Sequence, residues 1–572
     1  MKKSLYSLPQ ARNKVHLEPF DFSQNRMQSF MPGMIHVLQC IECLPGEKFR
    51  INVSSLTRTL PLNSAAIVRG KEHFNFHFVP TRLLWRYFPD FVIQNSHSDS
   101  AQDIINASVP SVCPSVSLAE LRAGLGTLYT NSTKDIFNRP ICYSINKLAQ
   151  QLGYGNLVSD WENNDPAAHT LLVNIFPFLA YQKIYQDFYR NTQWESYDAT
   201  TFNVDYLSSL QSNIDCNKLL INFDVSAPGC NLGIFTPRYA NYKKDMFFGI
   251  RPNSQFGEVS VVSVSTDNGT LSGGGNKAVA LGADGSLSIQ GATTSDPRIP
   301  VELKGQFDIL MLRKAEAIQR LREIQQASDF RYKSQIDRRF GFNVPDSRAQ
   351  MAEYITGFDN VLQITDVTAT ASTENGDAGS TLGQLGGKGT MVSSGDKTID
   401  YETKEHGYLV CTYYISHEVN YNAVGVNRNN MHLTFEDFFQ PEFQNIGLDS
   451  VLMSQLYFDY DIQENPNNPI GYAPRYLEYK TQPDLLLDQF MTGGSLSYWT
   501  TPLPWSKIAY YYNNNEQIDW PWFKIPPSAF DDIMLLGYSD DQTTNPFLST
   551  IYFDIKALRP MSVDGMPDWH NV

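Results

Sequence analysis

Two segments of the sequence place metal-binding side chains at suggestive spacings. Cys40 and Cys43 have the C-x-x-C spacing of zinc ligands, and His417 and Glu418 begin like the H-E-x-x-H helix of zinc proteases. That helix needs a second His where this chain has Tyr421, and no second C-x-x-C or suitably spaced His pair occurs. Four zinc ligands are therefore not assembled, and we predict no metal and no cofactor. The two cysteines lie in an apolar, strand-like run, which favours a structural role.

The glycine-rich segment around Lys388 is the best candidate for a phosphate-binding loop. Such a loop needs Gly five residues before its Gly-Lys pair and Ser or Thr directly after the lysine. These two positions hold Leu382 and Gly389, and neither G-x-G-x-x-G nor the G-x-S-x-G nucleophile motif occurs. The sequence offers no residues on which catalysis would rest, so we predict that the protein is not an enzyme.

Charge limits how this chain could meet nucleic acid. The formal net charge is −15, and affinity for phosphate comes mainly from Lys and Arg. A contact therefore requires a local basic surface or a separate basic protein. An extended N-terminal arm, residues 1–25, is one candidate surface, and its basic residues are Lys2, Lys3, Arg12 and Lys14. A frayed terminus without this role is the alternative.

A second basic stretch runs from Lys304 to Arg348. Its Lys and Arg residues are interleaved with aromatic residues, a mixture that single-stranded nucleic acid would use; the aromatic residues are Phe330, Tyr332, Phe340 and Phe342. Acidic residues are also mixed in. We therefore prefer a salt-bridged helical surface or a subunit contact as the interpretation.

The elements that must position these residues are mostly strands. Three segments, near both ends of the chain, alternate apolar and polar residues with period two, which marks strands with one buried face. Their apolar sets are Phe49, Ile51 and Val53; Phe74, Phe76 and Phe78; and Ile551, Phe553 and Ile555. Strands at opposite ends of the chain favour one sandwich or barrel over a row of small domains.

Three helices are also predicted. One begins at Ser117 with a capping box to Glu120, a second is opened by Pro177, and the third spans 308–327 with Leu310, Ala317, Leu321 and Ile324 on one packing stripe. An insertion over about 250–405 includes this third helix and two Gly/Ser/Thr-rich stretches, 257–298 and 365–400. With little core-forming content, both stretches are predicted to be surface excursions. The domain that carries the insertion is predicted to span 26–572.

Cysteine usage and the lack of apolar runs indicate where the protein is made. The seven cysteines are odd in number and scattered, which fits free thiols in a reducing cytoplasm better than a disulfide framework. The N-terminal sequence lacks the apolar core of a signal peptide. No run approaches the about 18 apolar residues of a membrane span, so no membrane insertion is expected.

Several blocks spread over nearly the whole chain resemble the major capsid proteins of microviruses (Microviridae), in particular those of the gokushovirus-like and gut-type branches. In chain order they are LPGEKFRIN (44–52), HFNFHFVPTRLLW (73–85), FPFLAYQKIYQDFYRNTQWE (176–195), PRYANYKKDMFFGIRPNSQFG (237–257), KAEAIQRLREI (314–324), RYKSQIDRRFG (331–341), IGYAPRYLEYK (470–480) and LRPMSVDGMP (558–567). Each block is modestly specific, and their order and span together are highly specific. Where that family commonly has Asp-Tyr-Phe, this chain has Asp245, Met246 and Phe247.

The resemblance implies a mainly β fold: an eight-stranded antiparallel jelly roll with long insertions that contain helices and loops. It also implies that the chain self-assembles into a T=1 icosahedral shell around the circular single-stranded DNA of a small bacteriophage. The implied location is the virion, after synthesis and assembly in the host bacterial cytoplasm. The implied partners are other copies of the chain, a small basic DNA-binding protein, other virion or scaffolding proteins, DNA bound without sequence preference, and a host receptor for the surface insertion.

A shell protein must bury large surfaces against its neighbours, and aromatic side chains are favoured anchors of such contacts. Trp499, Trp505, Trp520 and Trp522 lie in proline-rich chain near the C-terminal end. We expect these tryptophans to divide between core and subunit interface, and the alternative is that all four belong to the core. Two other classes of protein stay open: a glycan-binding β-rich spike or surface protein, and a carbohydrate-active enzyme with dispersed carboxylates.

Overall fold

The protein has 572 residues. The structure is a computed structural model. It describes residues 17–93, 112–157, 171–206, 233–255, 279–281, 287–289, 309–327, 329–368, 385–394, 397–458, 468–504, 507–508, 511, 518–534 and 545–563. The chain divides into two compact units: one is formed by 1–252 together with 331–572, and the other by 253–330.

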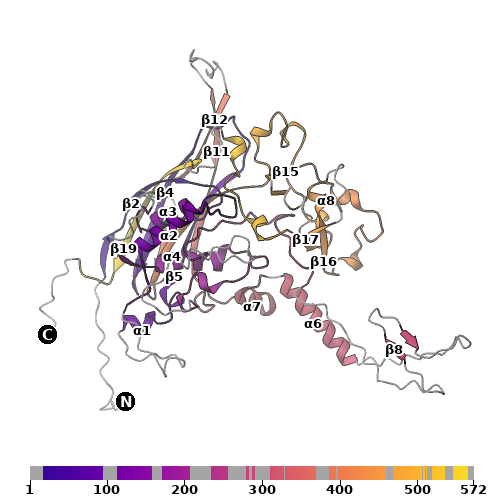
Figure 1. The fold of residues 1–572 in the computed structure, drawn as a ribbon, viewed down its shortest axis with the longest axis horizontal. Helices are drawn as coiled ribbons and strands as arrows, with labels where there is room; N and C mark the ends of the chain where they lie inside the picture. The colour runs from indigo at the N-terminus through magenta and orange to yellow at the C-terminus, as the bar shows by residue number, and fades with distance from the viewer. Residues whose placement is uncertain are drawn as a thin grey trace, which may run out of the picture. The chain divides into compact units, whose positions relative to one another are not determined.

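The larger unit contains a sheet of seven described strands, which combines strands from both ends of the chain with three strands from residues 363–402 (Figure 1). Its central strands are β19 and β4, which pair with each other in antiparallel register from Phe547–Thr59 to Leu558–Lys48. β1 and β2 also pair with β19, while β12 and β13 pair with β4, and β11 pairs with β12. The strands are β1 (Glu18–Asp21), β2 (Gln24–Phe30), β4 (Lys48–Thr59), β11 (Gln363–Thr368), β12 (Leu385–Ser394), β13 (Ile399–Glu402) and β19 (Phe547–Arg559).

A second antiparallel sheet has the order β10-β5-β14-β3. Its strands are β3 (His36–Cys43), β5 (Gly70–Pro80), β10 (Glu353–Val361) and β14 (Gly407–His417). The three strands predicted from period-two alternation are confirmed as parts of β4, β5 and β19, with all nine of their alternating apolar residues buried. The fold is therefore mainly β and antiparallel, as expected.

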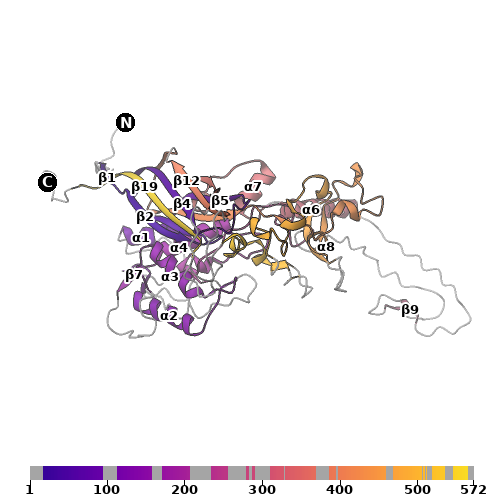
Figure 2. The ribbon, with the colours of Figure 1, turned by 90° about the horizontal axis from the view of Figure 1, so that it is seen from above.

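The two sheets share one apolar core, to which β4, β5, β14 and β19 all contribute. Helices contact the four-stranded sheet: α4 lies against β5 and β14, and α3 lies against β3 (Figures 1 and 2). The described helices of the larger unit are α1 (Phe88–Val92), α2 (Leu118–Thr130), α3 (Ile141–Gln151), α4 (Phe176–Ile184), α7 (Tyr332–Phe340) and α8 (Met453–Leu456). None of the helices that the structure describes combines the length and apolarity needed to cross a bilayer.

Two predicted helices are present with differences at their ends. Ser117 precedes α2, but its side chain makes no cap hydrogen bond, so the predicted capping box is not formed. Pro177 lies in the first turn of α4, and the helix continues as a wider π turn over Tyr185–Tyr189. This π turn was not foreseen, and π segments occur frequently at functional or strained positions.

The glycine-rich stretch that includes Lys388 is a strand where it is described. β12 pairs with β4 on one side and β11 on the other, although the sequence predicted a surface excursion over 365–400. A side chain at Gly387 would place its Cβ 2.1 Å from the carbonyl oxygen of Ser64. Position 387 therefore requires glycine, because the two backbones approach closely there. Glycine has a low strand propensity, so the sequence did not indicate a strand at this point.

The smaller unit contains β8 (Val279–Leu281), β9 (Leu287–Ile289) and α6 (Ile309–Ala327). β8 and β9 form an antiparallel pair inside the stretch 257–298, most of which lies outside the described residues. α6 confirms the predicted helix, but Leu310 is 70 % exposed and Leu321 is 40 % exposed. The predicted packing stripe is therefore not buried at these two positions.

The larger unit also contains three two-stranded sheets. β6 pairs with β7 and β16 with β17 in antiparallel register, while β15 and β18 are parallel. Their bounds are β6 (Ser115–Ser117), β7 (Leu172–Asn174), β15 (Tyr421–Asn422), β16 (Leu448–Leu452), β17 (Pro469–Pro474) and β18 (Leu485–Leu486). The strands β15 to β18 lie within the long C-terminal loops that also carry the candidate site (Figure 1).

Candidate functional site

The structure describes three of the eight residues selected from the sequence. Lys2, Lys3, Arg12, Lys14 and Trp505 lie outside the described residues. Trp499 is half-buried at the end of a short 3-10 turn, Ser497–Trp499. Its indole Nε1 is buried without a hydrogen-bond acceptor among the described residues.

The side chains of Trp520 and Trp522 are both buried, with exposed fractions of 4 % and 0 %. Trp522 stacks on Phe248 with ring centroids 5.5 Å apart, and its Nε1 donates to the carbonyl oxygen of Phe247 at 3.4 Å. Trp520 packs against Trp194 in a separate small cluster. For these two tryptophans, the structure agrees with the core alternative.

A buried polar group lies in the same segment. Lys524, at 1 % exposure, places its Nζ 2.7 Å from an oxygen of Glu195 and donates a hydrogen bond to the Tyr185 hydroxyl at 2.7 Å. The Tyr185 hydroxyl in turn donates to Glu195. A buried cation is stable only when it is paired and hydrogen-bonded in this way. These contacts connect the π turn to the C-terminal loops, and the charges of Lys524 and Glu195 neutralise each other.

The other chemical candidates from the sequence are structural as well. Cys40 and Cys43 are free thiols within β3, and His417 is buried at the end of β14. Among the described residues, no three His, Cys, Asp or Glu side chains gather closely enough to hold a metal ion. The candidate site that we propose is a surface formed by exposed side chains of the C-terminal loops.

The most apolar exposed surface of the C-terminal loops is formed by residues 433–446, which we call the acidic aromatic loop. It carries three acidic residues and no Lys or Arg. Monomeric proteins rarely expose large side chains in such a concentrated group unless they bind something. The exposed apolar residues are Leu433 at 88 %, Phe435 at 67 %, Phe438 at 52 %, Phe439 at 46 % and Ile446 at 57 %.

Hydrogen bonds hold the start of this loop in one conformation. The Asp437 carboxylate accepts from the backbone N–H groups of Leu433 and Thr434 and from the Thr434 hydroxyl, at 3.0, 2.8 and 2.9 Å. These bonds stabilise the charged carboxylate and lower the pKa of Asp437 to about 2. The turn presents Leu433 to solvent in a fixed position, which reduces the entropy cost of binding through it.

A second set of contacts holds the middle of the loop. The Tyr476 hydroxyl donates to the carbonyl oxygens of Glu436 and Phe438 at 3.1 and 3.3 Å. The Arg475 guanidinium lies over the rings of Phe443 and Tyr476, 5.7 and 5.2 Å from their centroids. The loop is therefore built as a rigid platform and not as a loose connection.

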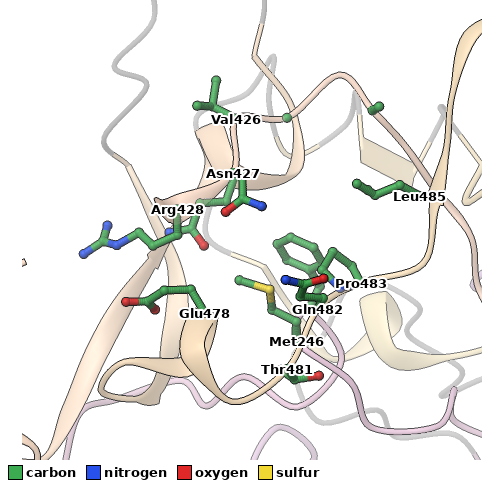
Figure 3. A pocket seen from close by; sticks show the side chains of 13 residues that line it. Met246, Val426, Asn427, Arg428, Glu478, Thr481, Gln482, Pro483 and Leu485 are labelled. Atoms are coloured by element: carbon green, nitrogen blue, oxygen red, sulfur yellow. The ribbon is translucent and has the colours of Figure 1, made fainter. Parts of the chain in front are cut away.

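A small pocket lies in the same C-terminal loops (Figure 3). Met246, Val426, Pro483 and Leu485 supply apolar lining, and Glu478 lies 3.3 Å from Nε2 of His432, which directly precedes the acidic aromatic loop. The pocket offers about 70 Å³ of space. It accommodates a few waters or a short side chain rather than a cofactor.

A second exposed surface is formed by residues 331–348, which we call the basic helix surface. It consists of α7 and the segment after it, and α7 ends at Gly341, whose φ of +66° suits glycine. Tyr332, Phe340 and Phe342 are 71 %, 77 % and 64 % exposed. This surface is the part of the basic stretch 304–348 that lies in the larger unit, and α6 is the other long described part of that stretch. We predicted a salt-bridged helical surface or a subunit contact for the whole stretch.

Only part of the charge on the basic helix surface is neutralised within the chain. Lys333 pairs with Asp346 at 2.5 Å, and Arg331 donates to the carbonyl oxygen of Arg190 at 3.3 Å. Arg338 and Arg339 are exposed, and within the described residues neither makes an ion pair.

Sequence reasoning missed the acidic aromatic loop. Its Phe and acidic residues follow no helical or strand period, so they carried no signal for a search based on periodicity. The feature that could have identified this loop is its composition. Four Phe and three acidic residues lie within residues 433–446, without the periodicity of a helix or a strand. Such a segment cannot bury all its rings locally, which is itself an indication of a binding surface.

A β-rich chain that holds exposed aromatic side chains on rigid surfaces is suited to building assemblies. Comparison with known proteins gives the family: the chain belongs to the capsid protein (F protein) family, which it matches over residues 10–139 and 158–568. Capsid protein VP1 of Bdellovibrio phage phiMH2K is 23 % identical over 543 residues, covering 92 % of this chain and 90 % of the relative. Capsid protein VP1 of Chlamydia phage 1 is 22 % identical over 644 residues, covering 99 % and 98 %.

These matches confirm the resemblance to the major capsid proteins of microviruses. The chain is a phage capsid protein, and membership of this family implies a structural role in the virion. The matches also decide between the shell protein and the alternative spike protein in favour of the shell.

Proposed function

We propose that this chain self-assembles into a T=1 icosahedral shell that encloses the circular single-stranded DNA of a small bacteriophage. The observation that carries this proposal is the family match, which extends over most of the chain. The two exposed aromatic surfaces of the larger unit support it, because a protein that stays monomeric would gain nothing from holding these rings in water.

We further propose that the seven-stranded and four-stranded sheets together are an elaborated eight-stranded jelly roll. The antiparallel pairing, the shared core and the union of the first and last strands in one sheet support this assignment. The extra strands β1, β2 and β13 would then be additions to the eight. Three of these eight strands, β10, β11 and β12, lie within the predicted insertion over about 250–405, so only the rest of that stretch would be added to the fold between β5 and β14.

Trp499 is the tryptophan whose surroundings best support a role at a subunit interface. It is only half-buried in the chain, and its indole N–H lacks an acceptor among the described residues. A neighbouring subunit could supply that acceptor, since buried indole groups usually find one. Trp505 stays a prediction for the same role.

DNA contact is proposed for the basic arm residues Lys2, Lys3, Arg12 and Lys14. With a net charge of −15, the chain cannot neutralise a genome by itself. A small, strongly basic protein packaged with the DNA would supply the missing charge. Replacing the four arm residues with Gln should lower the amount of DNA per particle, and an unchanged ratio of DNA to protein would count against the arm.

Assembly is tested by producing the full-length chain together with the other virion and scaffolding proteins of its phage in the host cytoplasm. Negative-stain microscopy should show uniform spheres, and the number of subunits per particle from mass measurement should be 60 for T=1 symmetry. Small oligomers under every condition would reject the shell. Purified virions that contain only this chain and DNA would reject the basic partner.

A further inference from the structure

The acidic aromatic loop, residues 433–446, has charges that the chain does not neutralise. Its three acidic residues give it a net charge of −3. Asp437 is used internally by the turn at Leu433. Glu436 and Glu442 are exposed, and neither makes an ion pair with another described residue. The loop thus presents two available carboxylates among exposed aromatic rings.

The basic helix surface, residues 331–348, has the opposite character. It contains five Arg or Lys and two Asp residues, which gives a net charge of +3. Lys333 and Asp346 neutralise each other. Arg338 and Arg339 follow each other at the C-terminal end of α7 and stand beside the exposed Phe340. The surface thus presents two available guanidinium groups among exposed aromatic rings.

We propose that the acidic aromatic loop of one copy binds the basic helix surface of the next copy in the shell. This inference rests on the proposed shell function and names the surfaces that would build it. The two surfaces match in sign and in magnitude of charge, and each adds aromatic rings, which with Arg are the favoured anchors of interfaces. Complementary charge fixes which surfaces meet and in what register.

The positions of the two surfaces on the chain determine which kind of contact they can form between copies. Both belong to the larger unit, and both are exposed, so neither covers the other within a copy. A contact between two different surfaces of identical copies is heterologous, and repetition of such a contact closes a ring. A ring of this kind is what the five-fold or three-fold axis of a shell requires.

The rigid turn at Leu433 makes the acidic loop suited to enter such a contact. Leu433 and Phe435 are the two most exposed apolar residues of the loop, and the Asp437 hydrogen bonds hold the turn before any partner arrives. Their methyl and phenyl groups would bury against Tyr332, Phe340 and Phe342. Glu436, which lies next to Phe435 in the chain, would then approach the two arginines.

Charge reversal tests the contact directly. The full-length chain is co-produced with the other proteins of its phage as wild type, as E436R/E442R, as R338E/R339E, and with all four changes. Each pair alone places like charges opposite each other, so particle yield on a sucrose gradient should fall at least about tenfold, and the four changes together should restore most of it. The variant K244E/K404E is the control for R338E/R339E, because it changes two exposed lysines outside both surfaces and lowers the net charge by the same amount.

Each outcome has a distinct meaning. Loss in both pairs with recovery in the combination supports the contact. Wild-type yield in either pair, or no recovery in the combination, overturns it. Normal particles of R338E/R339E that lack DNA would also overturn it and assign the basic helix surface to nucleic acid. Failure of the wild type to form particles would instead reject the proposed shell function, before the variants are compared.

A second measurement covers the case in which a charge reversal harms folding. Cysteines are placed at the two exposed rings in otherwise wild-type particles, as F435C, as F340C and as F435C/F340C, and the particles are treated with a short bifunctional thiol reagent. Linked dimers on a denaturing gel should form only with the double variant. Equal linkage in the single variants, or none in the double variant, would overturn the contact.

Discussion

At the scale of single residues, the carboxylate of Glu72 holds the two sheets together through hydrogen bonds. Glu72 lies on β5 at 0 % exposure and accepts from Ser55 and Thr57 of β4 at 3.0 and 2.8 Å. It also accepts from Asn360 of β10 at 2.6 Å and from Tyr413 of β14 at 2.8 Å. Four donors from three strands thus converge on one group inside an apolar core.

Replacing Glu72 with Leu should lower the free energy of unfolding of the chain by about 3–5 kcal/mol. The substitution leaves the buried hydroxyls of Ser55 and Tyr413 without this acceptor, while Thr57 keeps Ser549 and Asn360 keeps Ser55 as partners. Each unpaired buried donor costs about 1–3 kcal/mol before the core relaxes. Glu72→Gln keeps one acceptor oxygen and should cost less. Urea unfolding of the full-length variants measures both, with the exposed Glu402→Gln as control. Equal stability of the Leu variant and the wild type would contradict this account.

Buried histidines make stability depend on pH. In an unfolded chain the imidazole of His417 titrates near 6.5, whereas burial lowers its pKa in the folded chain to about 4. Between these values the unfolded chain binds a proton that the folded chain does not. The free energy of unfolding should therefore fall as the pH falls from 6.5 to 4, by about 3 kcal/mol in total from this residue.

Comparison of His417→Gln with the wild type isolates this contribution. Asp531 acts in the opposite direction, because burial raises its pKa to about 6 and the folded chain binds its proton first. The pH dependence of the wild-type unfolding free energy alone would therefore combine the effects of His417 and Asp531. The difference in unfolding free energy between variant and wild type should change in favour of the variant on going from pH 7 to pH 4. A difference that stays constant with pH would show that His417 binds its proton over the same pH range in the folded and the unfolded chain.

At the scale of elements, sequence patterns predicted the strands that have one apolar face. They missed β12, whose glycines allow the backbones of neighbouring segments to approach closely. β4, β5 and β19 alternate because one side of each lies in the core. β12 is just as central in its sheet, but its glycines remove the alternation. The acidic aromatic loop was missed for a related reason, since its rings serve a surface and follow no period. The burial of Trp520 and Trp522 depends on partners far away in sequence, such as Phe248 and Trp194.

Gly387→Val should disturb the pairing of β12 with its neighbours. The added side chain would meet the backbone of Ser64, which cannot move without disturbing the hydrogen bonds between Leu62 and Gly387. We expect a loss of about 2 kcal/mol or more in unfolding free energy from this overpacking. The neighbouring Thr390→Ala is the matched change on the same strand and should cost less than about 1 kcal/mol. A Gly387→Val chain with wild-type stability would mean that the strand can shift to make room.

At the scale of the whole molecule, the division into two units suggests a division of labour. Residues 253–330 form a compact unit of their own, and the stretch 257–298 inside it has little core-forming content. We propose that this surface insertion contributes to host attachment. The two largest sheets and both proposed contact surfaces belong to the other unit, so assembly and attachment would be separable.

Deleting 257–298 should leave particles that assemble in normal yield but adsorb poorly to host cells, by about tenfold or more if the stretch carries the main contact. Adsorption is measured as the fraction of particles removed from the medium by cells, and particle yield on a gradient is the control. Unchanged adsorption would count against the attachment role. Loss of particles would show that the stretch contributes to assembly.

The position of β19 also sets an order in time. This strand is translated after every other strand that the structure describes, yet it fills the place between β4 on one side and β1 and β2 on the other. Until it arrives, β4 has an open edge and the apolar residues Ile551, Phe553 and Ile555 are missing from the core. A chain whose translation stops early therefore lacks a finished sheet and is a target for proteases. Only a polypeptide translated through β19 would be competent to join its neighbours.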